Sequence, residues 1–128
     1  MALARHDDLG GNFHFDWFLG RVEECADDDA RIVRTFRCQS RIDHSLATDG
    51  ALLEQLDDHR WFYLYLSQTH QLSQGRGVVT PLARGWWRSI ETTDESVDEA
   101  IELRWDSDKA IRKYRITLQP ESRLFTLE

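Results

Sequence analysis

The sequence has few of the features that identify common classes of protein. It contains two cysteines, two prolines and seven glycines among 128 residues, which excludes a disulfide-rich scaffold and a collagen-like or low-complexity chain. No apolar run approaches the roughly 18 residues of a membrane-spanning helix. The first residues also lack the apolar core of a secretory signal. We therefore expect a cytoplasmic protein without a membrane partner.

Positive charge is scarcer than negative charge. The chain has 16 Lys and Arg against 23 Asp and Glu, which gives a formal net charge of −7. Proteins that bind nucleic acid gain affinity by neutralising phosphates with basic side chains, so no nucleic-acid partner is expected. Apolar residues at 41% and charged residues at 30% are typical of a globular chain, and the length suits one domain.

The two cysteines are not expected to pair. If residues 27–29 turn a hairpin, Cys25 lies beside the turn while Cys38 lies near Phe18, roughly 20 Å away at about 3.3 Å per residue. A disulfide cannot span that separation. Neither cysteine has a metal-ligand spacing, so two free, reduced thiols are expected.

Motifs for catalysis, cofactors and metals are missing as well. The chain has no GxSxG nucleophile elbow, no GxGxxG fingerprint and no Walker spacing. Its histidines form neither an i,i+4 pair nor an HxH motif, so their spacing predicts no metal site; they are His6, His14, His44, His59 and His70. The acidic clusters lack the alternation of a calcium loop. These absences favour a non-enzymatic protein with no catalytic residues and no cofactor.

What the sequence does contain is a clear antiparallel pattern in its last third. In residues 99–106, Ile101, Leu103 and Trp105 alternate with charged residues, which is the signature of a strand with one buried face. The same alternation returns in residues 114–118, and a third apolar segment begins at Arg123. Turn-forming residues separate these segments, so we predict a three-stranded meander.

The first third is harder to interpret. Residues 1–12 are poor in apolar side chains and are expected to form a flexible arm. Residues 13–25 fit both strand and helix spacing; we favour a strand, because Gly20 would cost about 1 kcal/mol inside a helix. Residues 30–42 read as a long second strand.

The middle of the chain changes character. Residues 48–59 carry a leucine stripe behind a capping residue, which predicts a short amphipathic helix. Residues 61–66 are apolar throughout, which is typical of a strand covered on both faces. Residues 78–82 read as extended structure at an edge, since Pro81 cannot donate to a ladder, and residues 85–90 as a further strand.

Together these segments predict a mainly β, single-domain fold over residues 13–128. The expected architecture is an antiparallel barrel or strongly curved sheet of about seven strands with one short helix. Four segments resemble the strands of small lipocalin-like barrels: Gly85–Arg88, Ile101–Asp106, Tyr114–Leu118 and Leu124–Leu127. The resemblance covers the C-terminal third and implies a barrel that encloses a small ligand.

Aromatic residues are the strongest candidates for a site. Trp61, Tyr63 and Tyr65 would project from one face of their strand, and an aromatic cavity results if further aromatic residues share that interior. A packed aromatic core is the alternative. Arg34 falls on an apolar face, so it requires an acidic partner, a ligand anion or an exposed position. The candidate ligand-binding residues are Arg34, Trp61, Tyr63, Tyr65, Trp87, Trp105 and Tyr114.

Two functions follow from these alternatives. A lined cavity predicts a protein that binds a small apolar or aromatic ligand. A packed core predicts a protein-interaction or assembly subunit. Residues 17–24 and 30–36 are similar to the opening hairpin of OB-type domains in phage baseplate hubs, which implies the second function. The oligomeric state cannot be read from the sequence.

Overall fold

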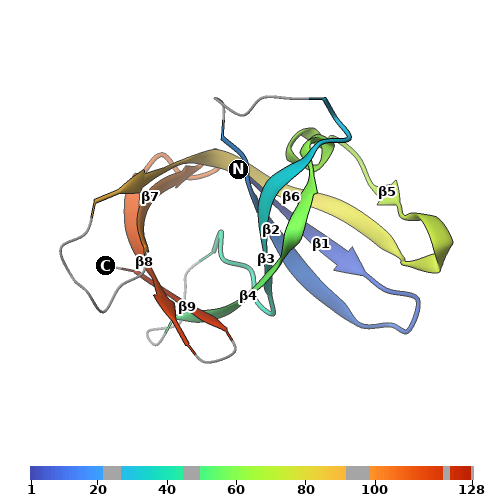
Figure 1. Ribbon diagram of the computed structural model, residues 1–128, viewed down its shortest axis with the longest axis horizontal. Helices are drawn as coiled ribbons and strands as arrows, with labels where there is room; N and C mark the ends of the chain where they lie inside the picture. The colour runs from blue at the N-terminus through green and yellow to red at the C-terminus, as the bar shows by residue number, and fades with distance from the viewer. Residues whose placement is uncertain (22–26, 45–49, 92–98, 120–121, 128) are drawn as a thin grey trace.

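The computed structural model describes residues 1–21, 27–44, 50–91, 99–119 and 122–127. Within these ranges the chain forms nine strands and two short 3-10 helices (Figure 1). The elements are β1 (Ala2–Asp7), β2 (Phe13–Leu19), β3 (Arg31–Cys38), β4 (Ala51–Arg60), η2 (Trp61–Tyr65), β5 (His70–Gln71), η3 (Ser73–Gly75), β6 (Val78–Ile90), β7 (Glu99–Trp105), β8 (Arg112–Leu118) and β9 (Arg123–Leu127).

The strands form a closed antiparallel barrel. Their order is β1-β2-β3-β4-β9-β8-β7-β6, and β1 closes the ring by pairing with β6. β5 adds to the edge of β6 outside this ring. The predicted mainly β antiparallel barrel is therefore confirmed, with eight barrel strands in place of about seven. No helix in the described residues is long and apolar enough to cross a membrane.

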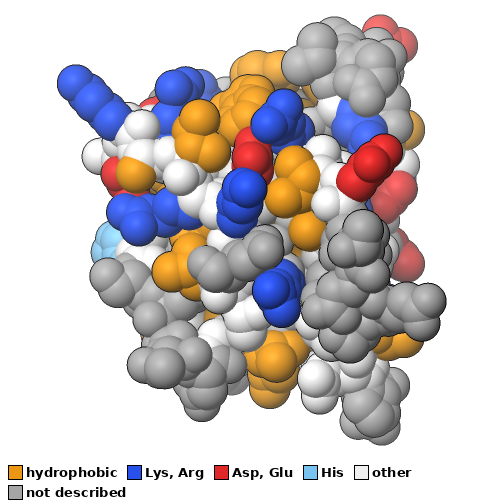
Figure 2. Space-filling view, turned by 90° about the vertical axis from the view of Figure 1, so that its left-hand side faces the viewer, with side chains coloured by type: hydrophobic (Ala, Val, Ile, Leu, Met, Phe, Trp, Pro, Cys, Tyr) orange, Lys and Arg blue, Asp and Glu red, His pale blue; other side chains and the backbone are white. Residues whose placement is uncertain are grey.

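The C-terminal meander agrees closely with the sequence pattern. β7 pairs with β6 and β8, and β8 pairs with β9. Ile101, Leu103 and Trp105 are buried, while Arg104 between them is exposed. Figure 2 views the molecule from the side of these strands, where charged side chains lie between apolar ones. One face of this wall is in contact with solvent.

Residues 2–7 form β1, although the sequence suggested a flexible arm over residues 1–12. β1 lies between β2 and β6, and Ala2, Leu3 and Ala4 are at most 5% exposed. This strand is hard to recognise in the sequence, because two of its buried residues are alanines, whose small side chains produce almost no hydrophobic pattern. The strand is stabilised by pairing on both sides.

Two predictions for the middle of the chain are wrong. The expected helix at residues 48–59 is strand β4 over its described part, with Leu53 fully buried and Leu52 62% exposed. Pairing with β3 and β9 outweighs the helical spacing of the leucines. The expected strand at residues 61–66 is the helix η2. Its apolar composition reflects packing against the barrel wall.

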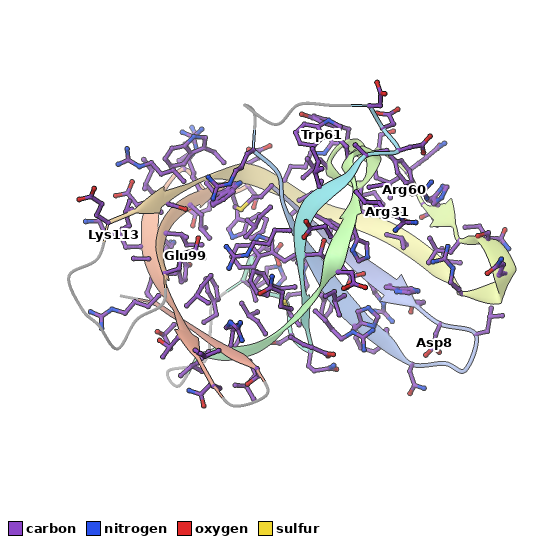
Figure 3. The ribbon with its side chains drawn as sticks, viewed as in Figure 1. Asp8, Arg31, Arg60, Trp61, Glu99 and Lys113 are labelled. Atoms are coloured by element: carbon purple, nitrogen blue, oxygen red, sulfur yellow. The ribbon has the colours of Figure 1, made fainter. Side chains whose placement is uncertain are left out.

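Side chains fill the space that the strands enclose (Figure 3). The core combines residues from seven of the strands and a loop. Its fully buried centre includes Trp17, Phe36 and Phe125, and the Trp17 ring lies 5.8 Å from Phe36 and 5.1 Å from Phe125 between centroids. These contacts give the barrel interior the close packing of a protein core.

A second apolar cluster covers the outer faces of β1, β2 and β3. η2 supplies Trp61, Tyr63 and Leu64 to it, and the Phe18 ring of β2 stacks on Tyr63 at 5.3 Å with an interplanar angle of 10°. Val33 on β3 is fully buried there. On this side the molecule therefore has two layers, the barrel wall and η2.

Cys38 is a free thiol in the barrel core, 1% exposed. It faces Phe15 across the β2–β3 pair, and Phe18 faces Thr35. The expected register near Phe18 is thus displaced by three positions along β2. The prediction of an unpaired Cys25 concerns a residue outside the described ranges. Burial raises the pKa of the Cys38 thiol to about 12, and the negative charge of Asp16 adds to the effect.

Candidate functional site

The aromatic residues proposed as a ligand site do not share one interior. Trp105 and Tyr114 belong to the barrel core, with Trp87 packed against it. Trp61 and Tyr63 belong to the second cluster, on the other side of the barrel wall. The division follows from η2, because a 3-10 helix outside the barrel replaces the strand that would have pointed these side chains inward.

The aromatic residues of the barrel interior pack against one another. Tyr114 stacks on Phe125 with ring centroids 4.5 Å apart and an angle of 16°. Desolvation by burial is the main cause that raises the pKa of the Tyr114 hydroxyl. The buried Nε1 atom of Trp105 has no hydrogen-bond partner in the described part of the chain. This part of the interior is occupied by side chains.

Arg34 has an acidic partner, which is one of the three environments expected for a charged residue on an apolar face. Its Nη1 atom donates to Oε2 of Glu99 at 2.6 Å, across the barrel from β3 to β7. The Ser89 hydroxyl lies 3.2 Å from the other Glu99 oxygen. The Arg34 guanidinium also lies over the Phe36 ring at 4.8 Å. Figure 3 shows Glu99 on the inner side of the wall, so this pair closes one end of the core.

A surface groove of about 540 Å³ lies where β6 passes the start of β1, the end of β2 and η2. We call it the rim groove. Its lining residues are Met1, Gly20, Arg21, Trp61, Leu64, Tyr65, Arg84, Gly85, Trp86, Trp87, Arg88, Ser89 and Asp106. Three of the residues proposed from the sequence lie here together: Trp61, Tyr65 and Trp87.

Fixed contacts hold the aromatic side chains of the rim groove. The Trp87 indole donates to the Gly20 carbonyl at 2.9 Å and so ties β6 to the end of β2. Trp61 is 5% exposed and lies 6.1 Å from the Tyr65 ring. Tyr65 and Trp86 are 61% and 41% exposed. The groove therefore has rigid aromatic walls and two accessible aromatic faces.

The rim groove is locally basic in an acidic protein. Arg21, Arg84 and Arg88 line it, against Asp106 as the acidic lining residue. Arg84 donates to the Leu66 carbonyl at 2.9 Å, a contact that orients the side chain. Arg88 forms an ion pair with Glu102, in which its Nη2 and Nε atoms lie 2.7 and 2.8 Å from Oε2 of the carboxylate. Both arginines therefore hold fixed positions beside the aromatic residues.

The amino group of Met1 lies in the same groove. It donates to the Gly85 carbonyl at 2.9 Å. Desolvation by burial is the main cause that lowers the pKa of this amino group, while Asp106 opposes the shift and Arg84 adds to it.

Sequence reasoning did not single out Arg84, Trp86 and Arg88. The usable signal was the run Arg84-Gly-Trp-Trp-Arg88, in which two cations flank two indoles. On a strand, Arg84, Trp86 and Arg88 share one face, which brings the cations close to the Trp86 ring. The Arg88 guanidinium lies 5.8 Å from the Trp86 ring. Arg21, from outside this run, lies 5.3 Å from the Trp87 ring.

Comparison of the sequence with protein-family models and with curated proteins finds no match.

Proposed function

We propose that the protein is a non-enzymatic binding protein and that its rim groove takes a small aromatic anion. The observation that carries the proposal is the convergence of Trp61, Tyr65, Trp86 and Trp87 with basic side chains on one groove. Rings on a ligand would stack on the exposed Tyr65 and Trp86 faces. An acidic group on the same ligand would pair with Arg84.

The dimensions of the groove suit this class of ligand. Small-molecule sites occupy roughly 300–1,000 Å³ and combine mostly apolar walls with a few placed polar groups. The rim groove, at about 540 Å³, lies within that range. An arginine beside an aromatic wall favours a ligand that carries both a flat ring and a negative charge. A purely apolar ligand would leave the charge of Arg84 unused.

The proposal keeps the binding role inferred from the sequence but moves the site. A lipocalin-like mode of binding would use the barrel interior, and the ring contacts of Trp17, Phe36 and Phe125 occupy that space. A ligand can reach the rim groove without displacing these residues. The closed antiparallel barrel agrees with the lipocalin resemblance in general kind, and we propose a different location for the ligand.

An assembly or protein-interaction subunit is the second candidate. The packed aromatic core favours it, because a filled barrel needs no ligand to be stable. In that case Trp86 and Tyr65 would contact a protein partner. The first candidate predicts that the isolated protein binds a small aromatic anion, and the second predicts that it binds a protein.

Paired fluorescent probes test the proposal. Anilinonaphthalene sulfonate carries an aromatic system and a negative charge, whereas N-phenyl-1-naphthylamine has the same rings without the charge. We expect the sulfonate to bind at one site per chain and to quench Trp emission. Trp86→Ala should weaken both probes about tenfold, since loss of a stacking contact amounts to up to about 1.5 kcal/mol.

The charge is tested separately. Arg84→Gln should weaken the sulfonate about five- to tenfold and leave the neutral probe unchanged. Phe13→Ala, which removes an aromatic ring that is 46% exposed and lies outside the groove, is the matched control. Equal affinity for the two probes, unaffected by either groove variant, contradicts the proposal. Self-association of the folded protein in that case would favour the assembly subunit.

A further inference from the structure

Two histidines and an aspartate meet on the outer face of the β1–β2 hairpin, the hairpin whose turn carries Asp8 in Figure 3. His6 faces His14 in the antiparallel register, and their rings lie 4.8 Å apart. Asp16 follows two residues after His14, so both side chains leave the same face of β2. One ligand atom from each of the three residues lies within 4.8 Å of the other two.

A hydrogen bond determines which His6 nitrogen can bind a metal. Nε2 of His6 lies 2.8 Å from the Arg76 carbonyl oxygen. A carbonyl only accepts hydrogen bonds, so Nε2 carries the proton, and in the neutral ring Nδ1 holds a lone pair. Nδ1 lies 3.9 Å from Oδ2 of Asp16. A metal-binding histidine commonly donates its second nitrogen to a backbone carbonyl in this way.

Asp16 is the least expected member of this cluster. It is 4% exposed, and its buried Oδ1 atom has no hydrogen-bond partner among the described residues, although Nε2 of His14 lies 3.1 Å away. A buried carboxylate oxygen without a partner is costly. The Asp16 carboxylate and the Nδ1 lone pair of His6 can both donate electrons to a cation located between them. A bound cation would satisfy both.

We propose that His6, His14 and Asp16 bind a divalent transition-metal ion, with Zn²⁺ as the representative ion. Imidazole and carboxylate donors suit such ions, while Mg²⁺ and Ca²⁺ favour oxygen ligands alone. Two ligands bound at 2.0–2.1 Å in tetrahedral geometry are about 3.3 Å apart. The 3.1 Å separation between His14 and Asp16 matches this spacing. The His6 ligand atom, which lies within 4.8 Å of the other two, would move closer on binding.

The three residues leave a coordination position open toward solvent. The side chains of His6 and His14 are 20% and 16% exposed, and both line a shallow pocket with Arg37 and Arg76. Zn²⁺ sites with three protein ligands hold water or another ligand in the fourth position. In this protein that ligand would lie beside two guanidinium groups, which favours an anion.

Metal titration tests the proposal directly. Purified, chelator-treated protein is titrated with ZnCl₂ by calorimetry and with CoCl₂ by visible absorption, since Co²⁺ reports its coordination through d–d bands. We expect one ion per chain, a raised Tm with Zn²⁺ and no response to Mg²⁺. His14→Ala and Asp16→Asn should each raise the Kd for Zn²⁺ by at least about tenfold and abolish the Co²⁺ bands.

His44→Ala is the matched control, because His44 also lies 3.9 Å from an aspartate, Asp43, but is 65% exposed. It should leave Zn²⁺ affinity unchanged. Circular dichroism establishes that each variant is folded, and the partly exposed His14 is the safer variant if Asp16→Asn unfolds. A folded wild-type protein with no Co²⁺ bands, or variants that bind Zn²⁺ as the wild type does, would overturn the assignment. Binding of anilinonaphthalene sulfonate should not change in His14→Ala, because the rim groove is separate from this cluster.

Discussion

The two sides of the barrel differ in what covers their outer faces. On the side of β7 and β8, most outward residues are charged; Glu102 and Lys113, for example, face each other across the strands. On the side of β1 to β3, Ala4, Phe18 and Val33 point outward and are at most 3% exposed, because η2 covers them. The wall is therefore one layer thick on one side and two layers thick on the other.

The difference shows that apolar and polar residues alternate along a strand only where one of its faces is exposed to solvent. Alternation therefore indicates a half-exposed strand, and a strand can exist without it. Where one face is wet, residues alternate and the strand is easy to recognise. Where both faces are covered, apolar residues occur at consecutive positions, and this pattern does not distinguish a strand from a helix. The same barrel thus contains strands that are plain in the sequence and strands that are obscure.

The largest expected change in the free energy of unfolding concerns the barrel core, which the inner faces of both sides form. Trp105→Ala should leave a void in the barrel core and lower the free energy of unfolding by about 3–5 kcal/mol, as measured by denaturant titration. Trp86→Ala, one strand away and 41% exposed, should cost less than about 1 kcal/mol. Equal losses would contradict the division between a packed inner face and an accessible groove.

An intermediate effect is expected in the second layer. A Cβ atom on Gly20 would overlap Cδ1 of Leu64 in η2, so Gly20→Ala should force the buried Leu64 side chain to shift and cost about 1–3 kcal/mol. In the Leu64→Ala background the same change should cost less, since the overlap is gone. Unfolding free energies of the four proteins measure this coupling.

Gly10→Ala is the control for this cycle, because Gly10 lies in the exposed β1–β2 turn. Its effect should stay within about 0.5 kcal/mol. Additive losses for Gly20→Ala and Leu64→Ala would show that η2 does not press on the end of β2.

The smallest effect at neutral pH is expected at Cys38, where the stability change should appear only in alkali. Burial raises the pKa of this thiol to about 12, while an unfolded cysteine titrates near 8.5. Above that lower pKa the unfolded chain loses a proton that the folded protein keeps, so stability falls as pH rises. In a Cys25→Ser background, unfolding free energies at pH 7 and pH 10 should reveal the loss.

Cys38→Ala in the same background should remove this part of the pH dependence. Native Cys38 should also react with a thiol reagent only at the rate of unfolding. Rapid labelling of the folded protein would mean that the inner face of β3 is open.

The barrel could be predicted from the sequence because the strands in the last third of the chain have one face exposed to solvent, which produces clear alternation. The expected strands beginning at residues 99 and 123 match β7 and β9 in position, and β8 begins two residues earlier than expected. The sequence could not identify β1, whose alanines carry little hydrophobic signal, or β4, whose leucine spacing fits a helix. In both cases pairing with two neighbouring strands decides the structure.

The candidate site was predictable in its chemistry and not in its arrangement. The need of Arg34 for a partner followed from burying a charge, and Glu99 meets it. The grouping of aromatic residues failed at η2, because no local pattern tells a covered strand from an apolar 3-10 helix. The His6–His14 pair required the β1–β2 register, and that register was inaccessible once residues 1–12 were read as an arm.

The order of the strands also has a consequence for how the protein folds. β1 to β4 pair with their sequence neighbours, as do β6 to β9, so each half can form from short-range contacts. Among the described strands, only two junctions, β1 with β6 and β4 with β9, join distant parts of the chain. Each must close a long loop before its hydrogen bonds compensate the lost chain entropy. Closing these two junctions is therefore expected to limit the folding rate, placing it in the slow range of about milliseconds to seconds that is typical of β barrels.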